Sequence, residues 1–158
     1  MAIMTLAGHV GIASALHALP WHLAWGTGNA AWDATPVPAS AGLTALTAEI
    51  GRYTATQVAY CTPDAGGILN FPSGRYAFSV TPTRYLYFKF HFENGPVYTI
   101  REAGLFMGTV PITGLPPGQR FFTPAQIQTP GTLLIVERFP AYTRAPSALE
   151  AVHFVLTF

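Results

Sequence analysis

The sequence contains very few charged side chains. Only 9% of its 158 residues are Asp, Glu, Lys or Arg, against about 25% in a typical soluble domain. Half of the residues are hydrophobic and the net charge is +1, so a sizeable core can form while the surface stays poor in ions. Burial of that surface against other protein chains explains the composition. A monomer with an uncharged Thr, Gln and Ser surface is the alternative.

Lysine and cysteine are almost absent. Lys89 is the single lysine, and the seven arginines are scattered one by one, whereas DNA-binding proteins usually carry a basic stripe. A bias toward arginine suits protein interfaces, although a GC-rich genome produces it too. Cys61 is alone, which excludes an intramolecular disulfide, and we interpret it as a buried free thiol. We therefore expect protein partners and no nucleic acid.

The motifs that usually carry chemistry are lacking as well. Gly26-Thr27-Gly28 has no third glycine and no lysine, so it predicts a turn and not a phosphate loop. The five histidines are not spaced as a short metal motif, and the serines show no nucleophile elbow. We expect no catalytic residues, no cofactor and no metal, and hence no enzyme. A metal at an oligomer axis and an acid–base pair of distant carboxylates remain open.

The first 20 residues are apolar but do not have the pattern of a targeting segment. No Lys or Arg precedes the apolar run, so the basic region of a signal peptide is missing, and the run stops at Pro20, short for a membrane span. Five apolar residues share one helical stripe: Ile3, Leu6, Val10, Ala13 and Leu16. We predict an amphipathic helix that docks on its own domain or on a neighbour, with no membrane insertion.

Turn-forming residues are plentiful, with 15 glycines and 14 prolines, which favours short strands over long helices. Residues 21–42 are interpreted as an irregular, proline-rich arm. Residues 43–51 have leucine and isoleucine at helical spacing and a closing Gly51, which predicts a short helix. We predict two parts: 1–42, a helix and arm for assembly contacts, and 43–158, a β domain. A variant lacking residues 1–42 is then expected to fold but not to assemble.

The strongest strand pattern lies in residues 85–92, where Leu86, Phe88, Phe90 and Phe92 alternate with polar or aromatic residues. Asn94-Gly95 predicts a hairpin turn, with the second strand running to about residue 106. Further strands are expected at 53–60, 75–80, 132–139 and 152–158, with one long loop at 107–131. The predicted fold class is mainly β: an antiparallel β-sandwich-like domain of about six strands, with an N-terminal helix, an extended arm and one further short helix.

Two local patterns indicate contacts. Arg101-Glu102 and Glu137-Arg138 are opposite charges within apolar strands. If these strands are neighbours, one Arg can pair with a Glu across the ladder; four surface charges are the alternative. Tyr85, Tyr87 and His91 form a row on one strand face, which could stack sugars or bases or pack under a loop or a neighbouring subunit. We favour packing.

Three segments carry a resemblance to a known group of proteins: WHLAWGTGN, LTALTAEIGRY and YTIREAGLF. Together they resemble bacteriophage tail and baseplate proteins, especially the N-terminal virion-attachment modules of tail fibres and the tail-collar proteins. The likeness covers roughly residues 21–110. Its structural motif falls on Glu102, Gly104, Leu105 and Phe106. The resemblance implies no catalytic residue and no cofactor.

The resulting hypothesis is a structural virion protein of a phage tail. The chain lacks a repetitive fibre shaft, so we expect an oligomeric adaptor at the baseplate or tail tip, a trimer or ring that docks tail fibres or other peripheral proteins. It would be made in the host cytoplasm and located in the virion. Alternatives are a carbohydrate- or receptor-binding module, a small cell-wall hydrolase, and a head-to-tail connector or tail terminator. The candidate interface residues are Leu6, Val10, Trp21, Trp25, Trp32, Tyr85, Tyr87 and His91.

Overall fold

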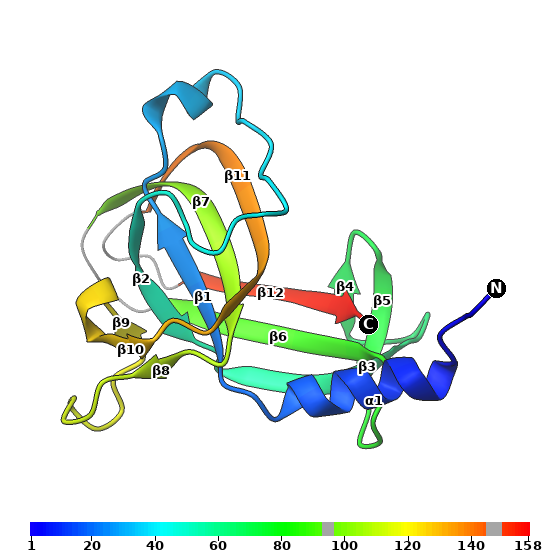
Figure 1. Ribbon diagram of the computed structural model, residues 1–158. Helices are drawn as coiled ribbons and strands as arrows, with labels where there is room; N and C mark the ends of the chain where they lie inside the picture. Colours follow the sequence, from blue (N-terminus) through cyan, green and yellow to red (C-terminus); the bar gives the residue numbers. More distant parts are fainter. Residues whose placement is uncertain (93–96, 145–149) are drawn as a thin grey trace. The chain divides into compact units, whose positions relative to one another are not determined.

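The chain folds mainly into short antiparallel strands. A computed structural model describes residues 1–92, 97–144 and 150–158 (Figure 1). The elements are α1 (Leu6–His17), β1 (Trp21–Gly26), η1 (Ala30–Asp33), β2 (Glu49–Thr54), β3 (Gln57–Pro63), β4 (Leu69–Phe71), β5 (Gly74–Phe78), β6 (Tyr85–Phe92), β7 (Tyr98–Met107), β8 (Val110–Pro111), β9 (Phe121–Phe122), η2 (Pro124–Gln126), β10 (Ile127–Thr129), β11 (Thr132–Arg144) and β12 (Glu150–Thr157). The predicted fold class, mainly β with an N-terminal helix, is confirmed.

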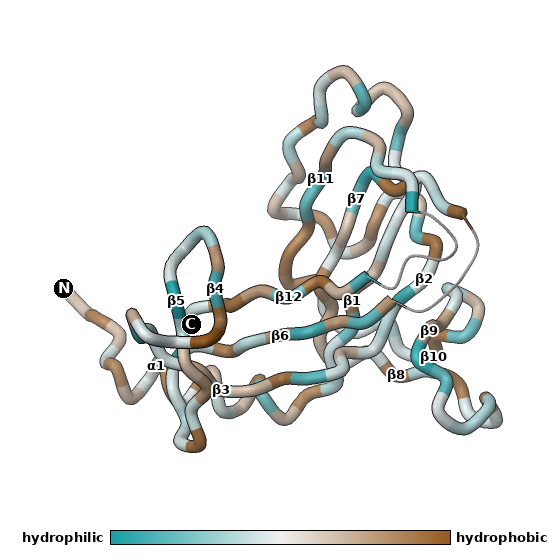
Figure 2. Tube along the Cα trace, turned by 180° about the vertical axis from the view of Figure 1, so that it is seen from behind, coloured by the Kyte–Doolittle hydropathy of each residue, from teal (hydrophilic) through white to brown (hydrophobic). Residues whose placement is uncertain are grey.

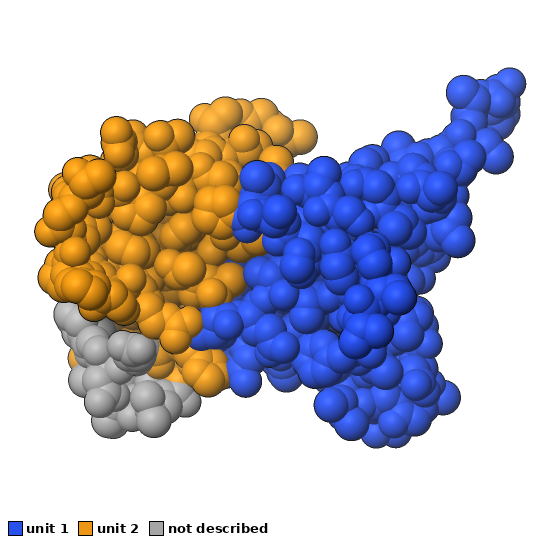
Figure 3. Space-filling view, turned by 90° about the horizontal axis from the view of Figure 1, so that it is seen from below, with its two compact units in different colours: residues 1–19, 56–90, 151–158 blue, residues 20–55, 91–150 orange. Residues whose placement is uncertain are grey.

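The chain divides into two compact units, coloured separately in Figure 3. Unit 1 comprises residues 1–19, 56–90 and 151–158, and unit 2 comprises 20–55 and 91–150. The strand order is β12-β6-β3-β5-β4 in one five-stranded sheet and β11-β7-β1-β2-β9 in the other, and β10 pairs with β8 in a small ribbon. This division differs from the predicted boundary at residue 42, because each unit is assembled from segments that are far apart in sequence. The assembly role of residues 1–42 stays a prediction.

Helix α1 packs on unit 1 through part of the predicted stripe, since Ile3 precedes the helix and is 83% exposed. The Thr5 hydroxyl caps the helix by accepting from the Gly8 amide at 3.1 Å. Ala13 is fully buried, and the His17 ring stacks on Tyr60 with centroids 4.4 Å apart. The part of the stripe nearest the N-terminus stays in solvent, since Leu6 is 65% exposed. The helix therefore docks through its second half.

Strand β6 confirms the predicted alternation. Leu86, Phe88, Phe90 and Phe92 are all at most 1% exposed, and Phe154 of β12 stacks on Phe88 with ring centroids 5.5 Å apart. Hydrophobic residues run along β12 (Figure 2). This strand, predicted at residues 152–158, pairs with β6 at the edge of the sheet.

The predicted hairpin over residues 85–106 is wrong. Strand β6 lies between β12 and β3, whereas β7 lies between β11 and β1 in the other sheet. Residues 93–96, which include the Asn94-Gly95 turn signal, are outside the described part of the chain. Alternation determines which side chains of a strand are buried, but it does not determine which strand lies beside it. The sequence pattern therefore predicts both strands correctly but not the strands that pair with them.

The interpretation of residues 21–26 as part of an irregular arm is also wrong. They form β1, which pairs with β7 on one side and β2 on the other, and all six residues are buried. The segment Trp-His-Leu-Ala-Trp-Gly is nearly continuous in its apolar character. A strand covered on both faces has this pattern in place of alternation.

Residues 43–51 do not form the predicted helix. Residues 49–54 form β2, and Leu46 packs with Ala24 and Phe106 in the core of unit 2. Gly51 is buried in β2, where an added Cβ would lie 2.6 Å from the Phe122 carbonyl oxygen. This glycine therefore permits close strand approach and does not cap a helix. The further helical segments among the described residues are the short η1 and η2.

Three further boundaries differ from the prediction. Residues 53–60 belong to two strands, because the Ala55 amide donates to the Trp21 carbonyl oxygen and the Thr56 amide to that of Lys89. The predicted loop at 107–131 contains β8, β9, η2 and β10. Strand β11 continues through Pro140, where a register shift between Arg138 and Tyr142 accommodates the proline. The strand count therefore exceeds the predicted six.

Candidate interaction surfaces

The Glu102–Phe106 motif serves the core of unit 2. Glu102 is fully buried in β7, and its Oε1 accepts a hydrogen bond from the Ala48 amide at 2.8 Å. Gly104 lies opposite Ala24 of β1, and an added Cβ would lie 2.9 Å from both Leu46 Cδ2 and Leu133 Cδ1. Leu105 and Phe106 are 2% and 0% exposed. The motif therefore fixes strand packing and presents no side chain to a partner.

Arg52 joins three segments of the same unit. It is 4% exposed, and its guanidinium lies 3.5 Å from the Phe106 ring centroid. Arg52 Nε donates to Glu49 Oε1 at 2.7 Å, and Nη1 donates to Thr109 Oγ1 at 2.8 Å and to the Pro130 carbonyl oxygen. A buried charge with this many partners is compensated. Arg52 of the EIGRY segment therefore connects β2 to Phe106, Thr109 and Pro130.

The charge pairs at Arg101-Glu102 and Glu137-Arg138 lie on neighbouring strands. β11 pairs with β7, and Arg138 stands directly opposite Glu102, as the cross-strand hypothesis required. The arginines nevertheless contact other partners. Arg101 forms an ion pair with Asp33. The guanidinium of Arg138 lies over the Trp32 ring, 4.4 Å from its centroid. The strand neighbourhood is confirmed, and the two arginines hold the segment that follows β1.

That segment, residues 27–48, is a long loop with joined ends, which we call the 27–48 loop. The Thr27 amide donates to the Ala48 carbonyl oxygen at 2.9 Å, which closes the neck. Compact loops whose ends meet and whose own side chains pack are often functional. Most side chains from residue 34 to 45 are exposed, so the tip of the loop is available to other molecules.

Side chains from β7 and β11 anchor the loop. Asp33 forms a two-point ion pair with Arg101, with distances of 2.7 and 2.9 Å to Nε and Nη2, and Asp33 Oδ1 also accepts from the Ala141 amide at 2.9 Å. The hydrogen bonds from Arg101 and Ala141 hold the pKa of Asp33 below its usual value. Trp32 is 6% exposed beneath the guanidinium of Arg138.

Beyond these anchors, Arg138 also supports the proline-rich part of the loop. Its Nη1 lies 3.4 Å from the carbonyl oxygens of Val37 and Pro38. The Val37 side chain is 52% exposed. We call residues 35–38 (Thr-Pro-Val-Pro) the proline ridge.

Four of the eight predicted interface residues are buried in the fold. The three tryptophans, Trp21, Trp25 and Trp32, are 1–6% exposed and pack within unit 2. Val10 is half-buried in α1, and Leu6 and His91 are exposed. The tryptophans are thus core residues here, while Leu6 and His91 are accessible.

The tyrosines of β6 belong to an aromatic cluster on one face of the unit 1 sheet. Tyr87 is 3% exposed, which makes its ring unavailable for stacking a sugar. Its edge-to-face partner Phe78, with ring centroids 5.2 Å apart, is 42% exposed. Tyr85 and Phe71 are half-buried and His153 is exposed. We call the accessible set, Phe71, Phe78, Tyr85 and His153, the aromatic face.

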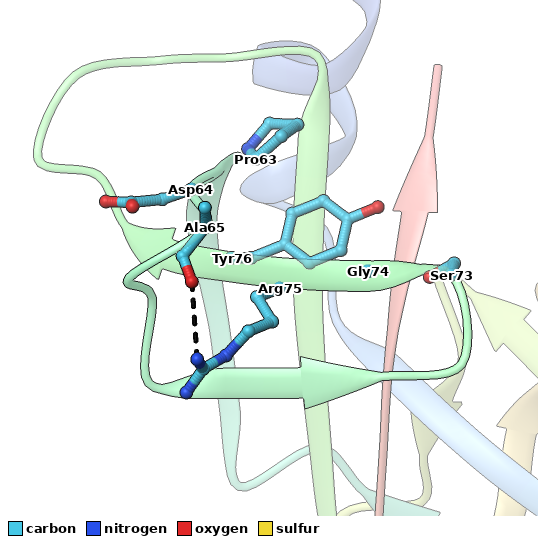
Figure 4. Close-up of a pocket in the computed structure, with 7 residues that line it drawn as sticks. All are labelled: Pro63, Asp64, Ala65, Ser73, Gly74, Arg75 and Tyr76. Atoms are coloured by element: carbon cyan, nitrogen blue, oxygen red, sulfur yellow. Dashed lines mark hydrogen bonds between the residues drawn. The ribbon is translucent and has the colours of Figure 1, made fainter.

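A shallow pocket lies along strand β5, between the β4–β5 turn and the loop that follows β3 (Figure 4). Its volume is about 590 Å³, and Asp64, Ser73, Arg75 and Tyr76 are among its lining residues. Arg75 Nη1 donates to the Ala65 carbonyl oxygen at 3.3 Å, and Asp64 Oδ1 accepts from the Gly66 amide at 2.8 Å. Both charged side chains therefore brace the loop that forms the pocket wall.

Burial shifts the pKa of two groups that sequence reasoning considered for chemistry. Burial, aided by the charge of Arg52, lowers the pKa of His22 to about 4, and burial raises the pKa of the Cys61 thiol to about 11. Cys61 is fully buried, as expected of a structural thiol. Among the described residues, no three His, Cys, Asp or Glu side chains are grouped so that they could hold a metal ion.

The recognisable motifs fill the core of this β-rich fold, and the apolar and aromatic side chains at its surface suit contacts with other proteins. The family described as "Baseplate wedge 3 tail fiber network component" matches residues 1–158. The chain therefore belongs to this family: it is a structural protein of the bacteriophage baseplate, located in the virion tail. No curated protein sequence matches the chain. Within the described residues, no helix has the length and hydropathy that a membrane span requires.

The match confirms the predicted likeness to phage tail and baseplate proteins. The narrower likeness to tail-collar attachment modules stays a prediction. Sequence reasoning missed Asp33 as an anchor of the 27–48 loop. The proline ridge lies within the arm at residues 21–42 that was assigned to assembly contacts, and that role stays a prediction. Asn29, which caps η1 by accepting from the Ala31 amide at 2.9 Å, was the available signal that residues 30–33 are ordered.

Proposed function

We propose that this baseplate protein is an adaptor that joins other baseplate or tail fibre proteins through surface contact and self-association, without catalysing a reaction. Membership of the family along the whole chain carries the proposal, because a network component must contact other proteins of the particle. Two features of the fold support the proposal: charged side chains pair within the fold, and large apolar side chains are exposed.

Several charged side chains are engaged within unit 2. Ion pairs form between Arg52 and Glu49, Arg101 and Asp33, and Arg144 and Glu150, and Glu102 is fully buried. These seven side chains are about half of the 15 Asp, Glu, Lys and Arg residues of a chain that is already poor in charge. An interface formed by such a surface loses little ion hydration on association.

Large apolar side chains remain in solvent in several elements. Leu6 of α1, Val80 after β5, and Ile135 of β11 are 65%, 101% and 40% exposed. Scattered exposed apolar residues are normal in a monomer, but a surface poor in ions makes them suited to contacts with other chains. Docking of neighbours would cover them.

The experiment is a phage in which the gene is deleted and the protein is supplied from a plasmid. We expect particles formed without the protein to lack fibres or other peripheral proteins when purified and measured by quantitative mass spectrometry. The wild-type plasmid should restore them. Gly11→Ala, an exposed substitution with no atom within 4 Å of the new Cβ, serves as the matched control and should restore them equally. Complete particles without the protein would refute the adaptor role.

A further inference from the structure

The proline ridge has a backbone that is restricted before any partner binds. Proline fixes its own φ near −65°, and the residue before a proline is confined to extended or polyproline II conformations. In Thr35-Pro36-Val37-Pro38 every residue is a proline or precedes one. Binding such a segment costs little conformational entropy, which is why proline-rich segments are common ligands.

The ridge presents acceptors and an apolar side chain, and it carries no charge. Pro36 and Pro38 have no amide hydrogen, so the backbone offers carbonyl oxygens almost alone. Arg138 approaches the carbonyl oxygens of Val37 and Pro38 from within the unit. No residue from Ala34 to Ala48 is charged. A matching surface should therefore offer rings and hydrogen-bond donors and need no carboxylate.

The aromatic face of unit 1 has this chemistry. Its rings meet edge to face, with Phe71 and His153 centroids 5.2 Å apart and Phe78 and Tyr87 also 5.2 Å apart. Donors line it: Arg84 stands over the Tyr85 ring, 5.0 Å from its centroid, and donates to the Tyr85 hydroxyl at 2.8 Å. Lys89 follows on the same face of β6, two residues beyond Tyr87. A donor-rich, cationic rim complements a ridge that has more acceptors than donors.

We propose that the proline ridge of one copy docks on the aromatic face of a second copy. This rests on the self-association in the proposed function and identifies the surfaces that carry it. Proline rings and Val37 would pack on Phe71, Phe78 and Tyr85, while the free carbonyl oxygens of the ridge accept from donors at the rim. Because ridge and face are different surfaces of one chain, the contact is heterologous and can repeat into a ring or a chain.

The test uses the purified protein in sedimentation velocity over a concentration series. We expect reversible self-association that the double substitution Pro36→Ala and Pro38→Ala weakens about tenfold or more, since the ridge loses both its rings and its restricted backbone. The matched control changes Pro116 and Pro117, two exposed prolines in the β8–β9 connection, and should associate like wild type. Raising NaCl from about 0.1 to 1 M should change the dissociation constant little, because the ridge is uncharged.

Mixing variants separates the two surfaces. Phe78→Ala damages the face and keeps the ridge, and the ridge variant keeps the face, so each alone should self-associate about tenfold or more weakly than wild type. Their mixture restores one intact contact and should form one-to-one dimers that do not grow. Circular dichroism on each variant verifies that it folds.

Three results would overturn the inference: a monomeric wild type, a ridge variant that associates normally, or a mixture without dimers. The particle experiment is independent, so a monomeric protein that still restores fibres would refute the self-contact and leave the adaptor role standing.

Discussion

Gly26 is closely packed by neighbouring atoms, whereas Gly11 faces open space. At Gly26 of β1 an added Cβ would lie 2.6 Å from Glu102 Cγ, whereas at Gly11 of α1 no atom lies within 4 Å. We expect Gly26→Ala to destabilise the protein by about 1–3 kcal/mol through overpacking. Gly11→Ala should stabilise it by up to about 1 kcal/mol, because alanine favours the helix. Urea unfolding of both variants measures the difference.

The Gly26 clash can be traced to one side chain. Glu102→Ala removes the carboxylate that fills the space opposite Gly26, so the double variant should be more stable than the sum of the single effects indicates. If the effects of the two substitutions are additive, the destabilisation by Gly26→Ala does not arise from contact with the Glu102 side chain.

His22 should make stability depend on pH. Its folded pKa is about 4 against an ordinary value of 6.5, so the unfolded chain binds the proton more tightly. The contribution is fully present above pH 6.5 and is lost as pH falls from 6.5 toward 4. Between pH 7 and 5 the loss should be about 2 kcal/mol. Urea midpoints at both pH values, for wild type and His22→Gln, check this, and an equal pH dependence in the variant would contradict it.

At the scale of elements, the 27–48 loop is held by side chains more than by backbone pairing. Asp33→Asn removes the charge that pairs with Arg101 while keeping the shape. We expect faster cleavage between residues 34 and 45 by elastase, which cuts after small residues, with the rest of the fold unchanged. Mass spectrometry of the fragments measures the site and rate.

Acid should have the same effect as Asp33→Asn. The folded pKa of Asp33 is lowered, so its contribution is present above the usual carboxyl pKa and is lost as pH falls through the lower folded value. Glu137→Gln is the matched control, because Glu137 is exposed on β11 and forms no ion pair among the described residues. If Glu137→Gln accelerates cleavage as much as Asp33→Asn, the anchor is not specific.

Individual elements were predictable where one face dominates. The β6 alternation and the α1 stripe identified buried Phe88 and Ala13 correctly, since period alone decides which side chains face a core. Strand β1 was missed because both of its faces are covered, which removes the alternation. The β6–β7 pairing was wrong because neighbours are chosen by long-range contacts that no local pattern records. The sequence predicts that Arg138 can face Glu102 only on the condition that their two strands are neighbours, and it does not show that they are.

Across the whole molecule, the N-terminal residues are not one detachable part. Residues 1–4 precede the capping Thr5 and are exposed, while residues 21–26 form the strand between β7 and β2. Removing residues 1–42 would therefore leave β7 and β2 without their shared neighbour and unpair both strands on that side. The expectation that the β domain folds without them is untested, and the position of β1 favours the opposite outcome.

We predict that a variant lacking residues 1–42 loses cooperative unfolding, whereas a variant lacking residues 1–4 keeps it. The longer deletion removes all three tryptophans, so fluorescence is unsuitable, and thermal unfolding by circular dichroism with amide hydrogen exchange is the appropriate measurement. Protection in β7 should disappear in the longer deletion, because its amides and carbonyls facing β1 become open to water. A cooperative transition with protected β7 amides would show that β1 is dispensable and that residues 1–42 form an appendage after all.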